Sequence, residues 1–422
     1  MVQSLRDLGR VLGATWPALL AWYLAGTLVH STVIAIAAPI GPQSALAALL
    51  LVPIAVLAKL VSYVGMFLAA RRAMRGYRQL ADGDVEFVSL RDAVGEFGRV
   101  LVASILPFFT LYALVGLVAE DLSAYARSAF RYSLGSETGV LEVGDGPLVV
   151  VVIVVAFAGR MLLKTFGHRL PRWVAIIEIY LEATWIFVAL SGINAVFGTI
   201  VDWLANRQVV QWVTDGRELL RGLWEPVRIV IDGIDWLLPT TAQLLLLPLA
   251  WLLVAGVIYT QSLANSVHQR TIPRRLEATL RLRVLHLPTP LRRQARLFAE
   301  EWHDVGSPLV LSGRMILGAG AQRIAMLVVI SGLLFAVGNW GTRALYLLIG
   351  PHDSLFWFTI DPLASLATAA IIEPVRIALL AVFFDLCLRG WTSRTTTMHV
   401  PVADRGAVTP REGRSAGSSA HR

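Results

Sequence analysis

Ionisable side chains inside apolar stretches are the residues whose types and spacing could support chemistry in this sequence. Lys59 and Arg160 are cations, while Glu178 and Glu182 are carboxylates four residues apart, a spacing that places both on one face of a helix. A charge inside a bilayer costs at least about 2.5–3.5 kcal/mol on insertion scales, so such residues pair with one another or face water. We therefore expect these four side chains to form one network. It would either select helix partners or provide a path for a proton or a solute.

A second candidate pair, Glu373 and Arg376, is separated by three residues and has Pro374 between its members. Proline removes a backbone N–H from a helix and kinks it, and the spacing allows the two charges to pair on one helix. The pattern predicts a kinked helix that serves either as a hinge or binding point or as a self-satisfied ion pair. We interpret His30 and Ser31 as packing residues.

Eight apolar stretches, separated by arginine-rich connections, must position these side chains. They cover roughly residues 13–39, 44–70, 100–119, 147–163, 173–201, 240–260, 322–349 and 355–388. Crossing about 30 Å of hydrocarbon takes roughly 20 helical residues, and backbone polar groups in lipid must pair within their own segment. The sequence therefore predicts an all-α polytopic membrane protein with about eight transmembrane helices.

Composition agrees with this fold class. Hydrophobic residues make up 56% of the 422 residues and charged residues only 16%, whereas soluble domains contain about 45–50% and about 25%. Most of the 37 lysines and arginines fall in the terminal segments and alternate connections, which the positive-inside rule assigns to the cytoplasm. We expect residues 1–389 to form a single transmembrane domain with both termini in the cytoplasm. Because only two of these residues are lysines, the bias suggests a GC-rich bacterial genome and hence the plasma membrane of a bacterium.

The connections predict surfaces of different character. The segment 202–238 carries four tryptophans among charged residues, which indicates helices lying on the outer leaflet or a docking surface for a protein partner. The cytoplasmic loop 261–321 contains two basic amphipathic stretches, which suit anionic lipids of the inner leaflet. These roles already account for the basic residues, so no nucleic acid is expected as a partner. We expect 120–146 to be an outer loop and 390–422 to be a disordered cytoplasmic tail.

Several absences limit the function. The sequence contains no GxxxxGK[ST] phosphate loop and no HExxH pair, and we predict no catalytic residue, cofactor or metal ligand. Cys387 is the only cysteine, which excludes a disulfide within the chain.

Three functions remain open. The first is a non-enzymatic component of the bacterial envelope or of a membrane complex, with 202–238 and 261–321 as interaction surfaces. The alternative is a transporter or channel for a small solute whose route is lined by the intramembrane charges. The third, which has the least support, is an intramembrane enzyme that modifies lipid. A transporter requires charged residues beside a solvated cavity, whereas a scaffold requires charges paired with one another in a dry core.

Overall fold

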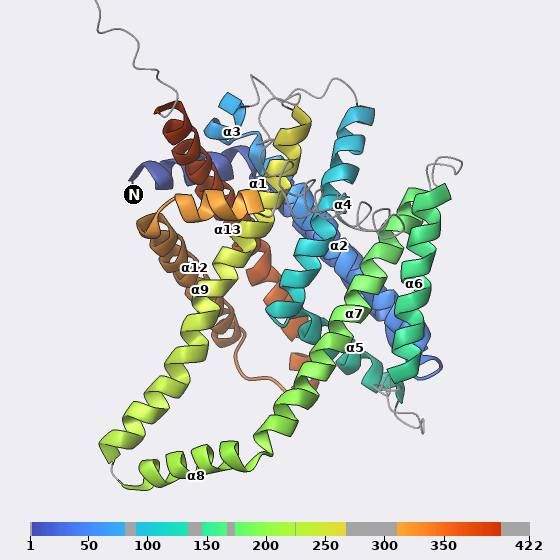
Figure 1. The fold of residues 1–422 in the computed structure, drawn as a ribbon, viewed down its shortest axis with the longest axis vertical. Coiled ribbons are helices and arrows are strands. Elements are labelled where there is room, and N and C mark those ends of the chain that lie inside the picture. The colour runs from blue at the N-terminus through green and yellow to red at the C-terminus, as the bar shows by residue number, and fades with distance from the viewer. Residues whose placement is uncertain are drawn as a thin grey trace, which may run out of the picture.

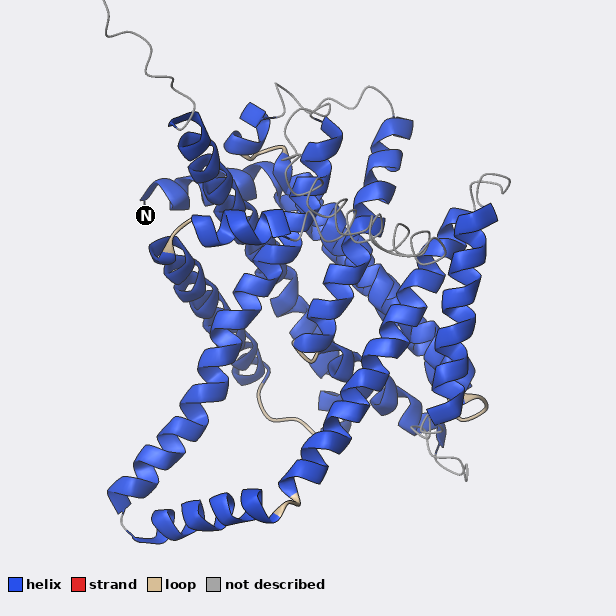
Figure 2. Ribbon diagram, viewed as in Figure 1, coloured by secondary structure: helices blue, strands red, loops and turns tan. Residues whose placement is uncertain are grey.

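The computed structural model describes residues 2–80, 90–133, 146–166, 174–223, 225–266 and 310–397, and within these ranges it contains helices and no strand (Figures 1 and 2). The helices are α1 (Val2–Ile40), α2 (Ala45–Arg71), α3 (Arg75–Leu80), α4 (Leu90–Leu114), α5 (Leu117–Ser133), α6 (Gly146–Phe166), α7 (Val174–Ala205), α8 (Gln208–Leu223), α9 (Glu225–Ser266), α12 (Ala321–Ile349) and α13 (Ser354–Thr397). Residues 310–318 are also helical.

Five of the described helices are long and apolar enough to cross a membrane. These segments lie in α1, α2, α4, α9 and α12. The prediction of an all-helical chain is therefore confirmed over the described residues, and five helices could cross a membrane by their length and composition. The remaining predicted apolar stretches are also helical, in α6, α7 and α13, and α6 contains a shorter apolar helical stretch, Val150–Leu163.

Helix α2 lies at the centre of the bundle. It is joined to α1 by a tight turn at residues 41–43, where Ser44 caps α2 by accepting a hydrogen bond from the backbone N–H of Ala47. α1 packs most extensively against α2, and α4, α7, α9 and α13 also contact α2. Close approach of α1 and α2 depends on glycine, because a Cβ at Gly65 would lie 2.3 Å from the ring of Trp22. Small residues at helix contacts are typical of membrane bundles, where van der Waals packing drives association.

The core contains a layer of large aromatic side chains. Phe67 of α2, Tyr259 of α9 and Phe384 of α13 are fully buried. The rings of Tyr259 and Phe384 stack with centroids 5.2 Å apart, and Phe67 meets Tyr259 edge-on at 5.8 Å. Such pairs stabilise a core beyond the effect of their buried area. This aromatic layer fills the space between α2, α9 and α13.

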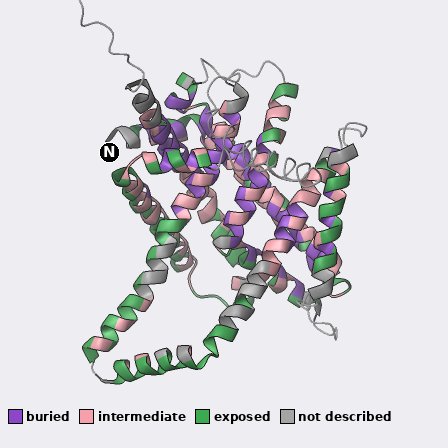
Figure 3. Ribbon diagram, in the orientation of Figure 1, coloured by how far each residue is buried: buried purple, intermediate pink, exposed green. Residues whose placement is uncertain are grey.

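Other helices expose most of their apolar surface (Figure 3). In α12 only Leu327 is buried, whereas Leu333, Phe335 and Trp340 are exposed. Valines of α6 are exposed in the same way, including Val151 and Val155. Apolar side chains exposed over the length of a helix are expected where lipid is the solvent.

The break between α4 and α5 corrects two predicted boundaries. The predicted apolar stretch 100–119 is interrupted at Gly116, which has a φ of 85°, a left-handed conformation that glycine adopts without strain. The predicted outer loop 120–146 begins instead within α5, an amphipathic helix that extends to Ser133. The buried residues Val118, Tyr125 and Ala129 recur at helical spacing along one face of α5, which explains why this polar segment is helical.

Other predicted segments fall partly outside the described residues. Helix α13 continues to Thr397, so the predicted tail boundary at Gly390 is too early. The tryptophan-rich segment 202–238 contains the end of α7, all of α8 and the start of α9. Most of the predicted basic loop, at 267–309, and the tail beyond 397 lie outside the described residues.

A buried ion pair joins three helices. Arg71 of α2 is 0% exposed, and its Nη2 donates to Oε2 of Glu96 on α4 at 2.9 Å, while Nη1 donates to the second carboxylate oxygen. Ser262 of α9 donates to Glu96 at 2.8 Å and lies 2.7 Å from the hydroxyl of Tyr77. We call Arg71, Glu96, Ser262 and Tyr77 the Arg71 cluster. A bidentate arginine–carboxylate pair fixes both distance and orientation, so this cluster sets how α2, α4 and α9 meet.

Replacing Glu96 by alanine should strongly destabilise the fold. Glu96→Ala leaves the guanidinium of Arg71 buried without its carboxylate, at a cost of about 3–5 kcal/mol. The measurement is the midpoint of thermal unfolding of the purified chain in detergent. Glu225→Ala is the control, because it breaks an exposed pair with Arg228 that should contribute less than about 1 kcal/mol. Equal midpoints for the two variants would contradict a structural role for the Arg71 cluster.

Candidate functional site

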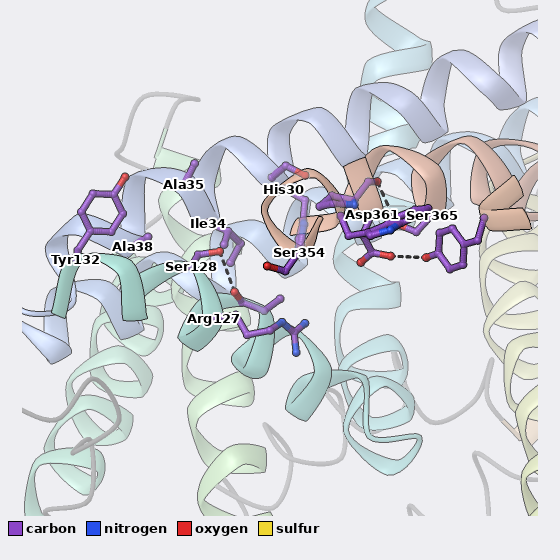
Figure 4. Close-up of a pocket in the computed structure, with 15 residues that line it drawn as sticks. His30, Ile34, Ala35, Ala38, Arg127, Ser128, Tyr132, Ser354, Asp361 and Ser365 are labelled. Carbon is purple, nitrogen blue, oxygen red and sulfur yellow. Dashed lines mark hydrogen bonds between the residues drawn. The ribbon is translucent and has the colours of Figure 1, made fainter. Parts of the chain in front are cut away.

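A cavity of about 940 Å³ lies between α1, α5, α12 and α13 (Figure 4). Its walls combine titratable, hydroxyl, aromatic and small apolar side chains: His30, Ser31, Ile34, Ala35, Ala38, Ala124, Arg127, Ser128, Tyr132, Tyr346, Ser354, Trp357, Asp361, Pro362 and Ser365. Arg127, Ser354 and Asp361 are exposed, so the cavity is open to the surface of the bundle. We call it the His30 cavity, because His30 is the wall residue that links it to buried charges. A few polar groups in an otherwise apolar concavity are typical of binding sites.

His30 connects this cavity to a buried charged cluster. Its Nε2 lies 3.3 Å from Oδ1 of Asp121 on α5. The same oxygen accepts a hydrogen bond from Nζ of Lys59 at 2.6 Å, and the hydroxyl of Tyr112 on α4 donates to Oδ2 at 2.5 Å. Lys59 Nζ also donates to the Tyr112 hydroxyl at 3.0 Å. We call these four residues the Asp121 cluster, and it ties α1, α2, α4 and α5 together beside the His30 cavity.

The environment of Asp121 keeps its carboxyl group ionised. Asp121 is only 3% exposed, and burial alone would raise the pKa of this carboxyl. The hydrogen bonds and positive charge supplied by His30 and Lys59 outweigh burial, and they lower the pKa of Asp121 below its ordinary value. The carboxylate therefore acts as a fixed negative charge beside Lys59 and His30.

A third cluster contains the predicted pair on α13. Nη2 of Arg376 donates to Oε2 of Glu373 at 2.5 Å and to the hydroxyl of Tyr63 on α2 at 3.2 Å. The guanidinium carbon of Arg376 lies 4.6 Å from the ring centroid of Trp251 on α9, within the range of a cation–π interaction. The two charges on α13 thus pair with each other and also hold α2 and α9. We call Arg376, Glu373, Tyr63 and Trp251 the Arg376 cluster.

Helix α2 contributes one residue to each of the three clusters. Lys59, Tyr63 and Arg71 share one face of α2, at spacings of four and eight residues, and successive fourth residues are neighbours on a helix. Phe67 occupies the intervening position on the same face and belongs to the aromatic layer. Polar clusters therefore follow one another along α2, and the aromatic layer separates the Arg71 cluster from the other two.

The residues predicted to form one network are divided in the structure. Lys59 belongs to the Asp121 cluster, whereas Arg160 on α6 pairs with Glu182 on α7 at 3.3 Å. Glu178 has no ion pair among the described side chains, and the described contacts do not join Lys59 to Arg160 or Glu182. The physical reason is that the carboxylate closest to Lys59 comes from α5, a segment that the sequence pattern assigned to a loop.

Asp121, His30 and Tyr112 were not predicted as site residues. The sequence offered one usable signal, because Val118, Asp121, Tyr125 and Ala129 fall on one face of a helix. An acidic residue on the apolar face of an amphipathic helix calls for a buried partner. His30 and Tyr112 carry no comparable signal, because a single polar residue in an apolar stretch is compatible with packing alone.

Metal-ligating side chains do not gather at one place in the part of the chain that is described. No group of three or more His, Cys, Asp and Glu side chains there is arranged to hold a metal ion, and Cys387 is buried. The side chains that line the His30 cavity can support ionic binding, hydrogen bonding and proton transfer through histidine.

Comparisons with known proteins do not assign a family. No protein-family model, no curated protein and no solved structure matches this chain.

The lowered pKa of Asp121 predicts a specific dependence of stability on pH. A carboxyl whose pKa is lower in the folded state stabilises the fold above its unfolded pKa of about 3.9, and the stabilisation is lost as pH falls through the folded value. Asp121→Asn should therefore unfold at a lower temperature than the wild type near neutral pH, and the difference should shrink as pH falls below about 4. Thermal unfolding across pH measures this.

Glu225→Gln provides the matched control, because Glu225 is exposed and outside the Asp121 cluster. A difference between wild type and Asp121→Asn that stays constant across this pH range would show that the carboxylate charge is not what stabilises the cluster.

Proposed function

We propose that this protein is a plasma-membrane transporter for a small solute, that it crosses the bilayer eight times, and that both termini lie in the cytoplasm. The solute would enter at the His30 cavity from the extracytoplasmic side. Buried charges along α2 would couple that cavity to the bundle core.

The directions of the helices support eight crossings. In Figure 1, α1, α4, α7 and α12 run from the upper part of the view toward the lower part, and α2, α6, α9 and α13 run back. The N-terminus and the end of α13 are both in the upper part, whereas α8 is at the lower extreme. The arginine-rich connections predicted to be cytoplasmic follow helices that end in the upper part. This arrangement agrees with the orientation expected from the charge distribution.

The observation that carries the transport function is the contact between an open cavity and a buried ionic cluster. His30 lies on the cavity wall and also 3.3 Å from Asp121, whose charge holds Lys59 and Tyr112. Further along α2, beyond Lys59 and Tyr63, Phe67 packs with Tyr259 and Phe384 in the fully buried aromatic layer. An open cavity that contacts a buried, closely packed core is compatible with one conformational state of an alternating-access transporter.

A second candidate is the envelope or membrane-complex component expected from the sequence. It is favoured by the apolar surface of α12 and by the corner formed by α8 and α9. At this corner Arg221 pairs with Asp232 at 2.9 Å and with Asp235 at 2.7 Å, while Trp212 is exposed. A rigid corner with an exposed tryptophan suits either a membrane interface or a protein partner.

Topology can be tested with single cysteines in a Cys387→Ser background. Cysteines replacing Gln43, Asp215 and Asp353, all exposed, should react with a membrane-impermeant maleimide added to intact cells. A cysteine replacing Arg78, also exposed, should react only after the membrane is opened. Labelling of position 78 in intact cells, or protection of any of the other three, would contradict the proposed topology.

Transport can be tested with a mixture of candidate solutes. Vesicles containing the full chain should take up at least one component of a defined mixture of amino acids, sugars, polyamines and zwitterionic amphiphiles, quantified by mass spectrometry after washing. Asp121→Asn should reduce that uptake at least about tenfold, because a hydrogen bond to a charged group contributes about 1.5–3 kcal/mol. Glu225→Gln should match the wild type. Uptake by the wild type no greater than that of protein-free vesicles would rule out transport of this mixture and favour the second candidate.

A further inference from the structure

One end of the His30 cavity is suited to a positively charged group. Asp361 of α13 is exposed and accepts a hydrogen bond from the hydroxyl of Tyr346 on α12. Trp357 lies one helical turn before Asp361 and meets the ring of Tyr346 edge-on, with centroids 5.2 Å apart. A carboxylate beside two electron-rich rings attracts an ammonium group by charge and by cation–π interaction.

A neighbouring part of the wall is suited to a negatively charged group. Arg127 of α5 is exposed at the cavity and lies next to Ser128, which also lines it. Arg127 Nη1 donates to Ser123 at 3.2 Å, a single bond from a side chain with five N–H donors. The planar guanidinium matches phosphate and carboxylate groups. In the view of Figure 4, Arg127 and Asp361 lie on either side of Ser354.

Apolar side chains of α1 lie toward the opposite end of the cavity. Ile34, Ala35 and Ala38 of α1 line it, and Figure 4 shows Ala38 and Tyr132 at the end away from Asp361 and Ser365. The small side chains of α1 leave an elongated surface that offers no hydrogen bonds. A ligand filling the cavity would therefore be charged at one end and apolar at the other.

We propose that the His30 cavity binds an amphipathic zwitterion. Its ammonium group would contact Asp361, Tyr346 and Trp357, its phosphate or carboxylate would contact Arg127, and its apolar body would lie along α1. As the solute of the transporter proposed above, this class of ligand rests on the proposed function. The zwitterionic headgroup could come from a membrane amphiphile or from a free metabolite, and the apolar wall favours the amphiphile.

Binding to the purified full chain at a fixed maltoside concentration tests this assignment with three probes. These are lysophosphatidylethanolamine, the anionic lysophosphatidylglycerol with the same acyl chain, and O-phosphoethanolamine, which has no chain. Native mass spectrometry measures the bound fraction of each. The wild type should prefer the ethanolamine lipid over the glycerol lipid by about tenfold, the ratio expected from one charged contact of about 1.4 kcal/mol.

Variants separate the two charged contacts. Asp361→Asn should abolish the preference by weakening the binding of the ethanolamine lipid alone. Asp361→Glu should retain the preference. Arg127→Gln should weaken the binding of both lipids, and Glu225→Gln should leave the binding of both unchanged. The unfolding midpoint of each variant is measured alongside its binding, so that loss of fold is not mistaken for loss of binding.

Equal binding of the two lipids by the wild type, or an unchanged preference in Asp361→Asn, would overturn the proposal. If O-phosphoethanolamine binds as tightly as the ethanolamine lipid, the ligand does not need an apolar chain. This result would overturn the proposal of an amphipathic ligand and indicate a free zwitterion instead. This result can be distinguished from that of the transport assay. Zwitterion binding without uptake would support the proposed binding site and contradict the transport function. Uptake of a solute that is unchanged in Asp361→Asn would support the transport function and contradict the proposed class of ligand.

Discussion

The need to pair every buried charge is the constraint on which this bundle depends. Helix α2 places Lys59, Tyr63 and Arg71 on one face, where unsatisfied polar groups would be costly. Each of these residues finds its partner on a different helix: Asp121 on α5 and Glu96 on α4 for the two cations, and the charged pair of α13 for Tyr63. Because the partners named here lie on other helices, pairing the polar residues of α2 helps to determine which helices surround it.

The same pairing places a potential binding site at the edge of the core. Asp121 must be buried to hold Lys59, and its helix α5 is therefore drawn against α1, where His30 meets the carboxylate. The outer face of α5 then forms one wall of the His30 cavity through Arg127 and Ser128. Structural pairing and the proposed ligand recognition thus share one helix.

Two kinds of surface surround this core. Around α2, aromatic and aliphatic side chains pack densely between helices, as in the layer of Phe67, Tyr259 and Phe384. Along α12 and α6, apolar residues face outward, where lipid would replace protein as their neighbour in the proposed membrane topology. In lipid, outward-facing leucine and valine cost nothing, so only small residues and polar pairs select helix contacts. The glycine at position 65 and the three charged clusters provide that selection.

The sequence by itself determined the helical runs, the short break between the apolar stretches 13–39 and 44–70, and the spacing that lets Glu373 pair with Arg376, because these depend on neighbours within a few residues. It placed helix ends less well where a polar amphipathic helix, α5, follows an apolar one. The tertiary structure alone decided that Lys59 binds Asp121 rather than Glu178 or Glu182, and that His30 lies between that pair and a cavity. Hydropathy shows that a buried charge needs a partner, but the identity of the partner depends on which helices pack together, and that is set by contacts between residues far apart in the chain.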